Sequence, residues 1–332
     1  FDQINNDQYL PAFEAGIKQQ RQEIDSIVNN PATPTFENTI LPYDKSGAIL
    51  DRVSNVFFNL QECCSDDEKQ AIAQQVLPML SKHGDDIAMN PKLFERIDYV
   101  YQHRNKDSLD AQQIRVVEKY HDDFIRRGAA LPAEKQAELR AVNEQLSTLS
   151  LQFGNHILKE NERFKLVIDN EANLAGLPQS SIDAAAEQAQ ADSMTGKWVF
   201  TLSKPSLFPF LQYADNRDLR EQIYRGYFTR GNHDDEFDNK SLINTLCKLR
   251  VQKARLLGYE SHAAYVLDNN MAKDPATVDL FLINIFNPAL KVAKNELAEM
   301  QALSQNYISF LNTGKTEREC AAYIIRQAKE AG

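Results

Sequence analysis

The chain has 332 residues, of which 42% are apolar and 25% charged, values typical of a globular protein with two domains or one large helical domain. Its 37 basic and 47 acidic residues give a net charge of -10, which disfavours nucleic-acid binding because phosphate contacts need clustered Lys and Arg. No apolar run approaches the roughly 18–20 residues that a membrane span needs, so no membrane span is expected. Position 1 is Phe, not Met, so we expect a trimmed chain whose start does not inform on a signal peptide.

Helix-forming residues dominate the first third of the chain, where apolar side chains recur at helical spacing. A first helix follows the N-cap signal Asn6-Asp7 and ends at Pro31. A second is expected from Phe36 or Glu37 to about Leu60, and a third begins after the cap Asp66. Two more helices are expected near residues 91–104 and 109–127.

Residues 133–162 are expected to form the longest helix. Its apolar positions alternate in threes and fours, a spacing typical of a helix that is buried against its neighbours. These positions are Leu139, Val142, Leu146, Leu149, Phe153 and Ile157.

Two later segments, residues 164–169 and 197–202, alternate apolar and polar side chains as strands do. A short helix over residues 180–191 separates them, so we expect them to pair as a small antiparallel sheet. Helices are then expected near 205–214, 216–229, 239–257, 261–269 and 275–300, the last kinked or interrupted at Pro288. The predicted fold is therefore mostly α, a multi-helical lobe with a small antiparallel β insertion.

The histidines do not form a recognisable zinc motif, because none stands in the H-E-x-x-H frame that places two imidazoles on one helix face. Three clusters nevertheless combine His with carboxylates. Glu118 and His121 have a spacing that di-iron bundles use twice, and His156 and Glu160 lie one helical turn apart and could share a metal. Residues 233–236 (His-Asp-Asp-Glu) follow a Gly-Asn turn but lack the calcium-loop spacing.

The favoured interpretations of these clusters are, in the same order, a solvated helix face, an exposed pair and a polar helix N-terminus with acids near the positive end of the dipole. The other histidines are His83, His103 and His262. No G-x-S-x-G, Walker loop or G-x-G-x-x-G motif occurs. No catalytic or metal-ligating residue is assigned, and the substrate-binding residues are unknown.

The four cysteines form no C-x-x-C pair. They are Cys63, Cys64, Cys247 and Cys320. Free buried or surface thiols are expected, with a long-range disulfide and a metal or redox role as alternatives. A bond between the adjacent Cys63 and Cys64 is disfavoured because its geometry is strained.

Eight short strings occur in a fixed order over residues 1 to about 300. They include Tyr9-Leu-Pro-Ala-Phe13, Arg52-Val-Ser-Asn-Val-Phe-Phe-Asn-Leu60, Asn90-Pro-Lys-Leu-Phe94, Leu174-Ala-Gly-Leu-Pro178, Arg220-Glu-Gln-Ile-Tyr224 and Asn270-Met-Ala-Lys273. Together they resemble the N-terminal part of the thimet-oligopeptidase-like zinc metallopeptidases, especially the bacterial peptidyl-dipeptidases (dipeptidyl carboxypeptidases) and oligopeptidase A. No single string is decisive, but their common order is specific.

This resemblance implies a helical, two-lobed clamshell whose deep channel admits short peptides. It also implies a zinc site in the other half, where an H-E-x-x-H motif and a later Glu bind zinc and activate water. None of those positions occurs here, so the expected cofactor is none in this chain and zinc in the full-length family. The implied partners are short peptides in the full-length family, and self-association or binding of the missing catalytic lobe is also expected. The resemblance leaves the localisation open between bacterial cytoplasm and cell envelope.

Beyond about Met300 the resemblance is expected to break. Residues 312–319 (Asn-Thr-Gly-Lys-Thr-Glu-Arg-Glu), within a tail over about 303–332, resemble the N-terminus of another zinc exopeptidase family, the aspartyl aminopeptidases. A fused, truncated or assembled sequence would explain this, and a diverged helical hairpin is the alternative. The expected domains are a helical N-terminal domain (1–162), a β/α insertion (163–215), the start of a peptidase lobe that ends before the zinc motif (216–300), and a helical tail of different origin (301–332).

Two functions fit these observations. The chain is either an N-terminal fragment or homologue of a zinc-dependent peptidyl-dipeptidase, inactive alone, or a non-catalytic helical module that binds peptides or a partner. Apolar side chains are also expected to lack partners within the chain over 239–300: Leu246, Leu249, Leu257, Phe281, Leu282, Ile285 and Phe286. We therefore expect self-association, a partner chain, or a tail folded back so that Tyr307, Ile308, Phe310 and Leu311 cover the gap.

Overall fold

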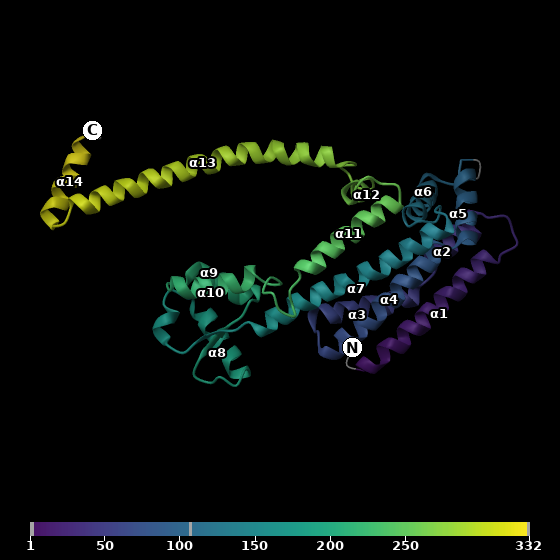
Figure 1. Ribbon diagram of the computed structural model, residues 1–332, viewed down its shortest axis with the longest axis horizontal. Coiled ribbons are helices and arrows are strands. Elements are labelled where there is room, and N and C mark those ends of the chain that lie inside the picture. The colour runs from purple at the N-terminus through teal and green to yellow at the C-terminus, as the bar shows by residue number, and fades with distance from the viewer. Residues whose placement is uncertain (1–2, 106–107, 331–332) are drawn as a thin grey trace. The chain divides into compact units, whose positions relative to one another are not determined.

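The computed structural model describes residues 3–105 and 108–330, which are mostly helical. The chain divides between Tyr259 and Glu260 into two compact units. The first unit contains α1 (Tyr9–Val28), α2 (Leu41–Lys45), α3 (Ala48–Cys63), α4 (Asp67–Ala88), α5 (Pro91–His103), α6 (Ala111–Arg126), α7 (Ala133–Arg163), α8 (Gln179–Ala191), α9 (Lys204–Tyr213), α10 (Arg217–Phe228) and α11 (Lys240–Leu256) (Figure 1). The second contains α12 (His262–Leu267), α13 (Pro275–Thr313) and α14 (Glu317–Glu330).

Three short turns of other helix types complete these elements. They are 3-10 turns at Asn6–Gln8 and Glu171–Leu174 and a π-helical turn at Phe36–Ile40. Asn5, not Asn6, caps the first of them, and α1 follows it directly. The expected cap Asp66 is confirmed, because its side chain accepts a hydrogen bond from the backbone N–H of Lys69. Ser261 caps α12 in the same way, through the backbone N–H of Ala264.

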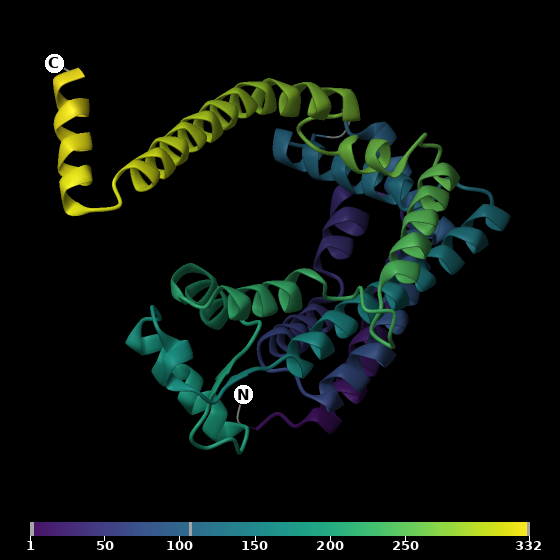
Figure 2. The ribbon, with the colours of Figure 1, turned by 60° about the vertical axis from the view of Figure 1, so that its left-hand side comes forward.

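The long helices of the first unit pack side by side, with α1 against α3 and α4, and α7 between α4 and α11 (Figure 2). Gly16 permits the close approach of α1 to α3, since a methyl group there would lie 3.0 Å from the Cα of Leu50. The predicted stripe of α7 is confirmed at Leu139 and Val142, which are buried, and its remaining positions are half-buried. Packing of this stripe explains why a helix of 31 residues is stable here.

The predicted second helix is in fact interrupted. The turn at Phe36–Ile40 continues into α2, which ends at Lys45, and α3 begins only at Ala48. Gly47 has a φ of +80°, a left-handed conformation that ends a helix and that other residues adopt at a cost. Its N–H donates to Oε2 of Glu23 on α1 at 2.7 Å, so the break is fixed to the neighbouring helix.

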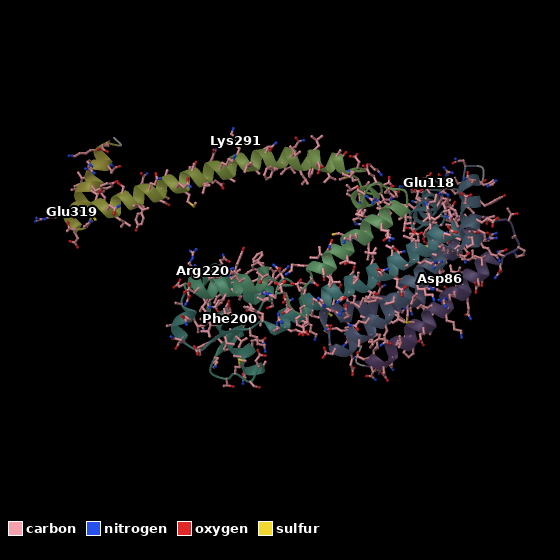
Figure 3. All side chains as sticks on the ribbon, in the orientation of Figure 1. Asp86, Glu118, Phe200, Arg220, Lys291 and Glu319 are labelled. Atoms are coloured by element: carbon pink, nitrogen blue, oxygen red, sulfur yellow. The ribbon has the colours of Figure 1, made fainter. Side chains whose placement is uncertain are left out.

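The small antiparallel sheet is confirmed, although its strands are shorter than expected. β1 (Leu166–Ile168) pairs with β2 (Trp198–Phe200), with Leu166 opposite Phe200. The sheet packs with α8, α9 and α10 around a separate hydrophobic core that includes Phe200 (labelled in Figure 3) and Phe210. This core lies apart from two others, which are formed by α1 to α6 and contain Phe13 and Phe124.

The longest helix is α13, with 39 residues, and not α7 as expected. It continues through Pro288 without interruption and curves gently in Figure 1, because a proline within a helix removes one hydrogen bond but leaves the others in place. Residues 303–313 belong to it, so Tyr307 and Phe310 extend the helix and cannot fold back over it.

Most apolar side chains of α13 are exposed, as expected for Phe281 and Phe286. The same expectation is wrong for Leu246 and Leu249, which are buried on α11 where that helix packs against α7. By length and apolar character, α13 is also the one helix of the described residues that could cross a membrane, although none was expected. Its apolar residues are interspersed with polar ones, so the sequence shows no continuous run. Core helices of soluble proteins meet the same requirement.

Candidate functional site

A polar cavity of about 300 Å³ lies among α4, α7 and α11, where the apolar stripe of α7 is interrupted by Asn143. The amide nitrogen of Asn143 donates to both carboxylate oxygens of Asp85, at 2.9 and 3.1 Å. Its carbonyl oxygen accepts a hydrogen bond of 2.8 Å from Nζ of Lys253. Arg127 lines the same cavity and donates to the backbone carbonyl of Gly84 at 2.9 Å. The arrangement joins three helices through one buried side chain, Asp85, and two half-buried ones, Asn143 and Lys253.

Burial shifts the titration of two of these groups toward their neutral forms. Burial raises the pKa of the Asp85 carboxyl, and this effect outweighs the hydrogen bond from Asn143 and the nearby cations of Arg140, Arg127 and Lys253. Burial lowers the pKa of Lys253, although the charge of Asp85 opposes that shift. A buried Asp and Lys with opposed shifts can result from a purely structural network, so the shifts alone do not make this cavity an active site.

A second cavity of about 280 Å³ shares Arg127 with the first and is lined by Gln20, His83 and Tyr120. Nε2 of His83 lies 2.8 Å from Oε1 of Gln20, and burial lowers the pKa of this imidazole. Burial, together with the hydrogen bond to Asp44, raises the pKa of Tyr120. The hydrogen bonds to Gln20 and Asp44 fix His83 and Tyr120 between the helices. Among these residues, no nucleophile is activated by a neighbouring base.

The expected solvated face at Glu118 and His121 is wrong for the histidine. His121 is buried, stacked on the ring of Tyr101 with centroids 3.8 Å apart, and its Nε2 lies 3.0 Å from Oδ1 of Asp98. Glu118 (labelled in Figure 3) instead forms ion pairs with Arg104 and Arg115. The two side chains therefore have separate partners, and aromatic packing explains the position of the histidine.

The pair of His156 and Glu160 is also not exposed as expected. Glu160 is buried: its Oε2 accepts a hydrogen bond from the N–H of Gly231, and its Oε1 accepts one of 2.9 Å from Arg163. Nδ1 of His156 lies 2.9 Å from Oδ1 of Asn239. The end of α7 thus binds both ends of the loop that precedes α11.

This arrangement brings two of the predicted clusters together, since Nε2 of His233 lies 3.7 Å from Oε1 of Glu160. Arg163 also pairs with Asp235 at 2.8 Å. Residues 233–236 lie in a loop and not at a helix N-terminus, because α11 begins only at Lys240. Both carboxylate oxygens of Glu160 therefore already accept hydrogen bonds, from a backbone N–H and from an arginine, which leaves little capacity to bind a metal.

The residues that the structure describes do not fit a zinc ion. Within residues 3–105 and 108–330, no group of three or more His, Cys, Asp or Glu side chains is placed to hold a metal. The cysteines are free, and the Sγ atoms of Cys63 and Cys64 lie 3.7 Å apart, beyond bonding distance.

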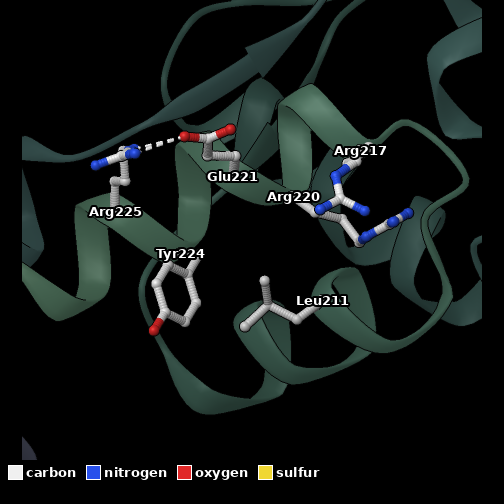
Figure 4. A pocket seen from close by; sticks show the side chains of 6 residues that line it. All are labelled: Leu211, Arg217, Arg220, Glu221, Tyr224 and Arg225. Atoms are coloured by element: carbon white, nitrogen blue, oxygen red, sulfur yellow. Dashed lines mark hydrogen bonds and ion pairs between the residues drawn. The ribbon is translucent and has the colours of Figure 1, made fainter. Parts of the chain in front are cut away.

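An open pocket of about 580 Å³ lies on α9 and α10, outside all of the predicted clusters (Figure 4). It is lined by Leu211, Arg217, Arg220, Glu221, Tyr224 and Arg225. This pocket was not predicted, although Arg217, Arg220 and Glu221 recur in the sequence at the three- and four-residue spacing that places side chains on one helix face. Three of its six lining side chains are arginines.

Comparisons with known proteins agree with the resemblance found in the sequence. Residues 210–323 match the model of Peptidase family M3. The chain is 37% identical over 303 residues to dipeptidyl carboxypeptidase of Escherichia coli, which covers 91% of this chain and 44% of that protein. It is 29% identical over 309 residues to oligopeptidase A of the same organism (92% and 45%), and 24% identical over 285 residues to saccharolysin of Saccharomyces cerevisiae (85% and 39%).

The chain thus spans less than half the length of these relatives. The family match reaches residue 323, and so it includes most of the tail beyond Met300 for which another origin was expected. That origin and the bounds of the four expected domains stay predictions. The similarity to dipeptidyl carboxypeptidase and the family match over residues 210–323 lead to one conclusion: this chain is a relative of Peptidase family M3 and corresponds to a partial segment of its longer members.

Proposed function

We propose that this chain is one lobe of a zinc-dependent peptidyl-dipeptidase, which removes dipeptides from the C-terminus of short peptides, and that it does not hydrolyse peptides alone. The observation that carries the proposal is the 37% identity to dipeptidyl carboxypeptidase along 91% of the chain. The zinc ligands and the general base are expected outside this segment, because the described residues offer no ligand group for a metal.

A direct assay tests the proposal. The purified chain is incubated with zinc and an N-acetylated tetrapeptide, and the products are identified by mass spectrometry. We expect no dipeptide release and less than one zinc per ten chains by elemental analysis, because activation of water needs a bound metal. Zinc bound at one equivalent, with turnover that a chelator abolishes, would overturn the proposal.

A complementation assay tests whether this chain contributes to an active enzyme. Addition of the part of Escherichia coli dipeptidyl carboxypeptidase that this chain does not match is expected to restore dipeptide release, if the two parts assemble. The exposed apolar side chains of α13 favour such an assembly.

A second candidate function is a non-catalytic module that binds peptides or a partner protein. The same exposed face of α13 is the observation that favours it. Stable peptide binding together with a complete lack of activity in the complementation assay would support this module over the peptidase lobe.

A further inference from the structure

The three arginines of the pocket on α9 and α10 have different partners. Arg225 forms an ion pair with Glu221: its Nε and a terminal nitrogen both lie 2.7 Å from Oε1 of the glutamate, and the dashed line in Figure 4 marks this contact. Arg217 has no hydrogen-bond or ion-pair partner among the residues that the structure describes. The cavity therefore contains a guanidinium whose donors are available.

Arg220 is held in a fixed position beside it. One of its terminal nitrogens donates to the backbone carbonyls of Ala214 and Asp215, the latter at 3.0 Å, where α9 leads into α10. Because Arg217 and Arg220 are three residues apart on α10, their side chains are neighbours on one face of the helix. Two adjacent guanidinium groups repel each other, so an anion that contacts both would relieve this repulsion.

One side of the pocket is apolar and aromatic. Leu211 and Tyr224 lie opposite the two arginines in Figure 4, and the volume of about 580 Å³ is within the range of roughly 300–1,000 Å³ for small-molecule sites. Glu221 lies one turn from Arg217 but is turned toward Arg225. The pocket thus combines a cationic end with an apolar and aromatic side.

The geometry points to a carboxylate-binding site between Arg217 and Arg220, which takes the C-terminal carboxylate of a short peptide whose last side chain lies on Leu211 and Tyr224. A guanidinium fork matches a carboxylate in shape and charge, and two such groups give several charge-assisted hydrogen bonds. This inference rests on the proposed function for its substrate class, short peptides, and adds the residues that recognise the free C-terminus.

A titration followed by calorimetry tests the site on the full chain. N-acetyl-Ala-Phe with a free carboxylate is expected to bind at least about tenfold more tightly than its C-terminal amide, because the amide has no charge for the arginines. The variant Arg217→Gln is expected to lose at least about tenfold in affinity for the free acid and to leave the amide unaffected. Arg52→Gln, which removes an exposed arginine on α3, is the matched control and should bind as the wild type does.

A second variant tests the apolar side of the pocket. Tyr224→Ala is expected to weaken N-acetyl-Ala-Phe more than N-acetyl-Ala-Gly, since only the phenyl group contacts the ring. Far-UV circular dichroism and the urea midpoint check that each variant is folded.

Three outcomes would overturn the inference: equal binding of acid and amide, wild-type binding by Arg217→Gln, or inorganic phosphate that binds as tightly as the peptide and displaces it. No detectable binding of either peptide to the wild type would also overturn it. The proposed function fails in a different way, through zinc-dependent cleavage by the chain alone, so the two failures are distinguishable.

Discussion

Lys253 and Asn143 are 110 residues apart in the chain, yet Nζ of the lysine donates a hydrogen bond of 2.8 Å to the amide oxygen of the asparagine. The same asparagine donates to Asp85, so α11, α7 and α4 are joined through one side chain. An apolar residue at position 143 could fill the space but could not satisfy either charged group. Replacement of one residue in such a hydrogen-bond network lowers the stability of the fold, because its partners are left without hydrogen bonds.

Replacement of this asparagine tests that argument. We expect Asn143→Ala to lower the free energy of unfolding by about 2–3 kcal/mol, because Asp85 and Lys253 both lose a partner in a poorly solvated site. Gln145→Ala, an exposed position two residues away on α7, is the control and should change the free energy by less than about 0.5 kcal/mol. Urea denaturation followed by circular dichroism measures both. Equal effects of the two variants would contradict a special role for the network.

The raised pKa of Asp85 predicts a pH dependence of stability. Between its ordinary value and the raised folded value, the folded chain keeps a proton on this carboxyl that the unfolded chain has lost. The contribution of Asp85 to stability therefore decreases as the pH rises through this window. The variant Asp85→Asn cannot ionise, so its stability relative to the wild type should increase from about pH 4 upward. Urea midpoints at several pH values between 4 and 7 measure the difference, and a difference independent of pH would show that the carboxyl is not perturbed.

Glu160 and Glu162 are two glutamates of α7 with different environments, which allows a matched comparison. Glu160 is buried and binds the N–H of Gly231 and the guanidinium of Arg163, whereas Glu162 forms an exposed ion pair with Lys159. We expect Glu160→Ala to destabilise the first unit by about 2–4 kcal/mol, because it leaves the buried N–H of Gly231 without its acceptor and removes one of the two carboxylate partners of Arg163. Glu162→Ala should cost less than about 1 kcal/mol. Thermal unfolding of both variants measures this contrast, and a larger loss for Glu162→Ala would refute it.

The exposed face of α13 predicts association in solution. Phe281 and Phe286 are 63% and 60% exposed, and large exposed apolar patches are uncommon on soluble monomers. We expect the chain to bind a hydrophobic dye and to show a concentration-dependent mass in light scattering, with both signals reduced in the double variant Phe281→Lys, Phe286→Lys. The control Gln301→Lys, Gln305→Lys adds the same charge to the same helix at exposed polar positions and should leave both signals. A monodisperse monomer that binds no dye would contradict the prediction.

The helices and the sheet could be predicted because their signals are local. Apolar spacing indicated α1 and α4 to α11, and the alternation at residues 164–169 and 197–202 indicated the sheet. The break at Gly47 was missed because the apolar spacing continues across it, while the left-handed φ of that glycine decides the structure. The length of α13 was underestimated, because the helix was expected to end near residue 300 and in fact continues to Thr313. The kink or interruption expected at Pro288 is also absent, since the helix continues through this proline.

The environment of the charged residues could not be predicted in this way. The burial of Glu160 depends on a loop 71 residues later in the chain, and that of His121 depends on the ring of Tyr101 on another helix. Spacing along one helix shows which side chains are neighbours, but it does not show which face another element will cover. The arginines of α10 are visible in the sequence, whereas their different partners appear only once Ala214, Asp215 and Glu221 are placed.

The division of the chain after Tyr259 has a practical consequence for protein production. All three hydrophobic cores lie before this residue, and Tyr259 itself accepts a hydrogen bond of 3.1 Å from Arg126 within the first unit. A stop codon placed after Tyr259 would remove the apolar surface of α13 while it keeps every side chain of those cores. Such a shortened protein should give higher soluble yields from an expression host and sharper amide signals in solution NMR than the whole chain.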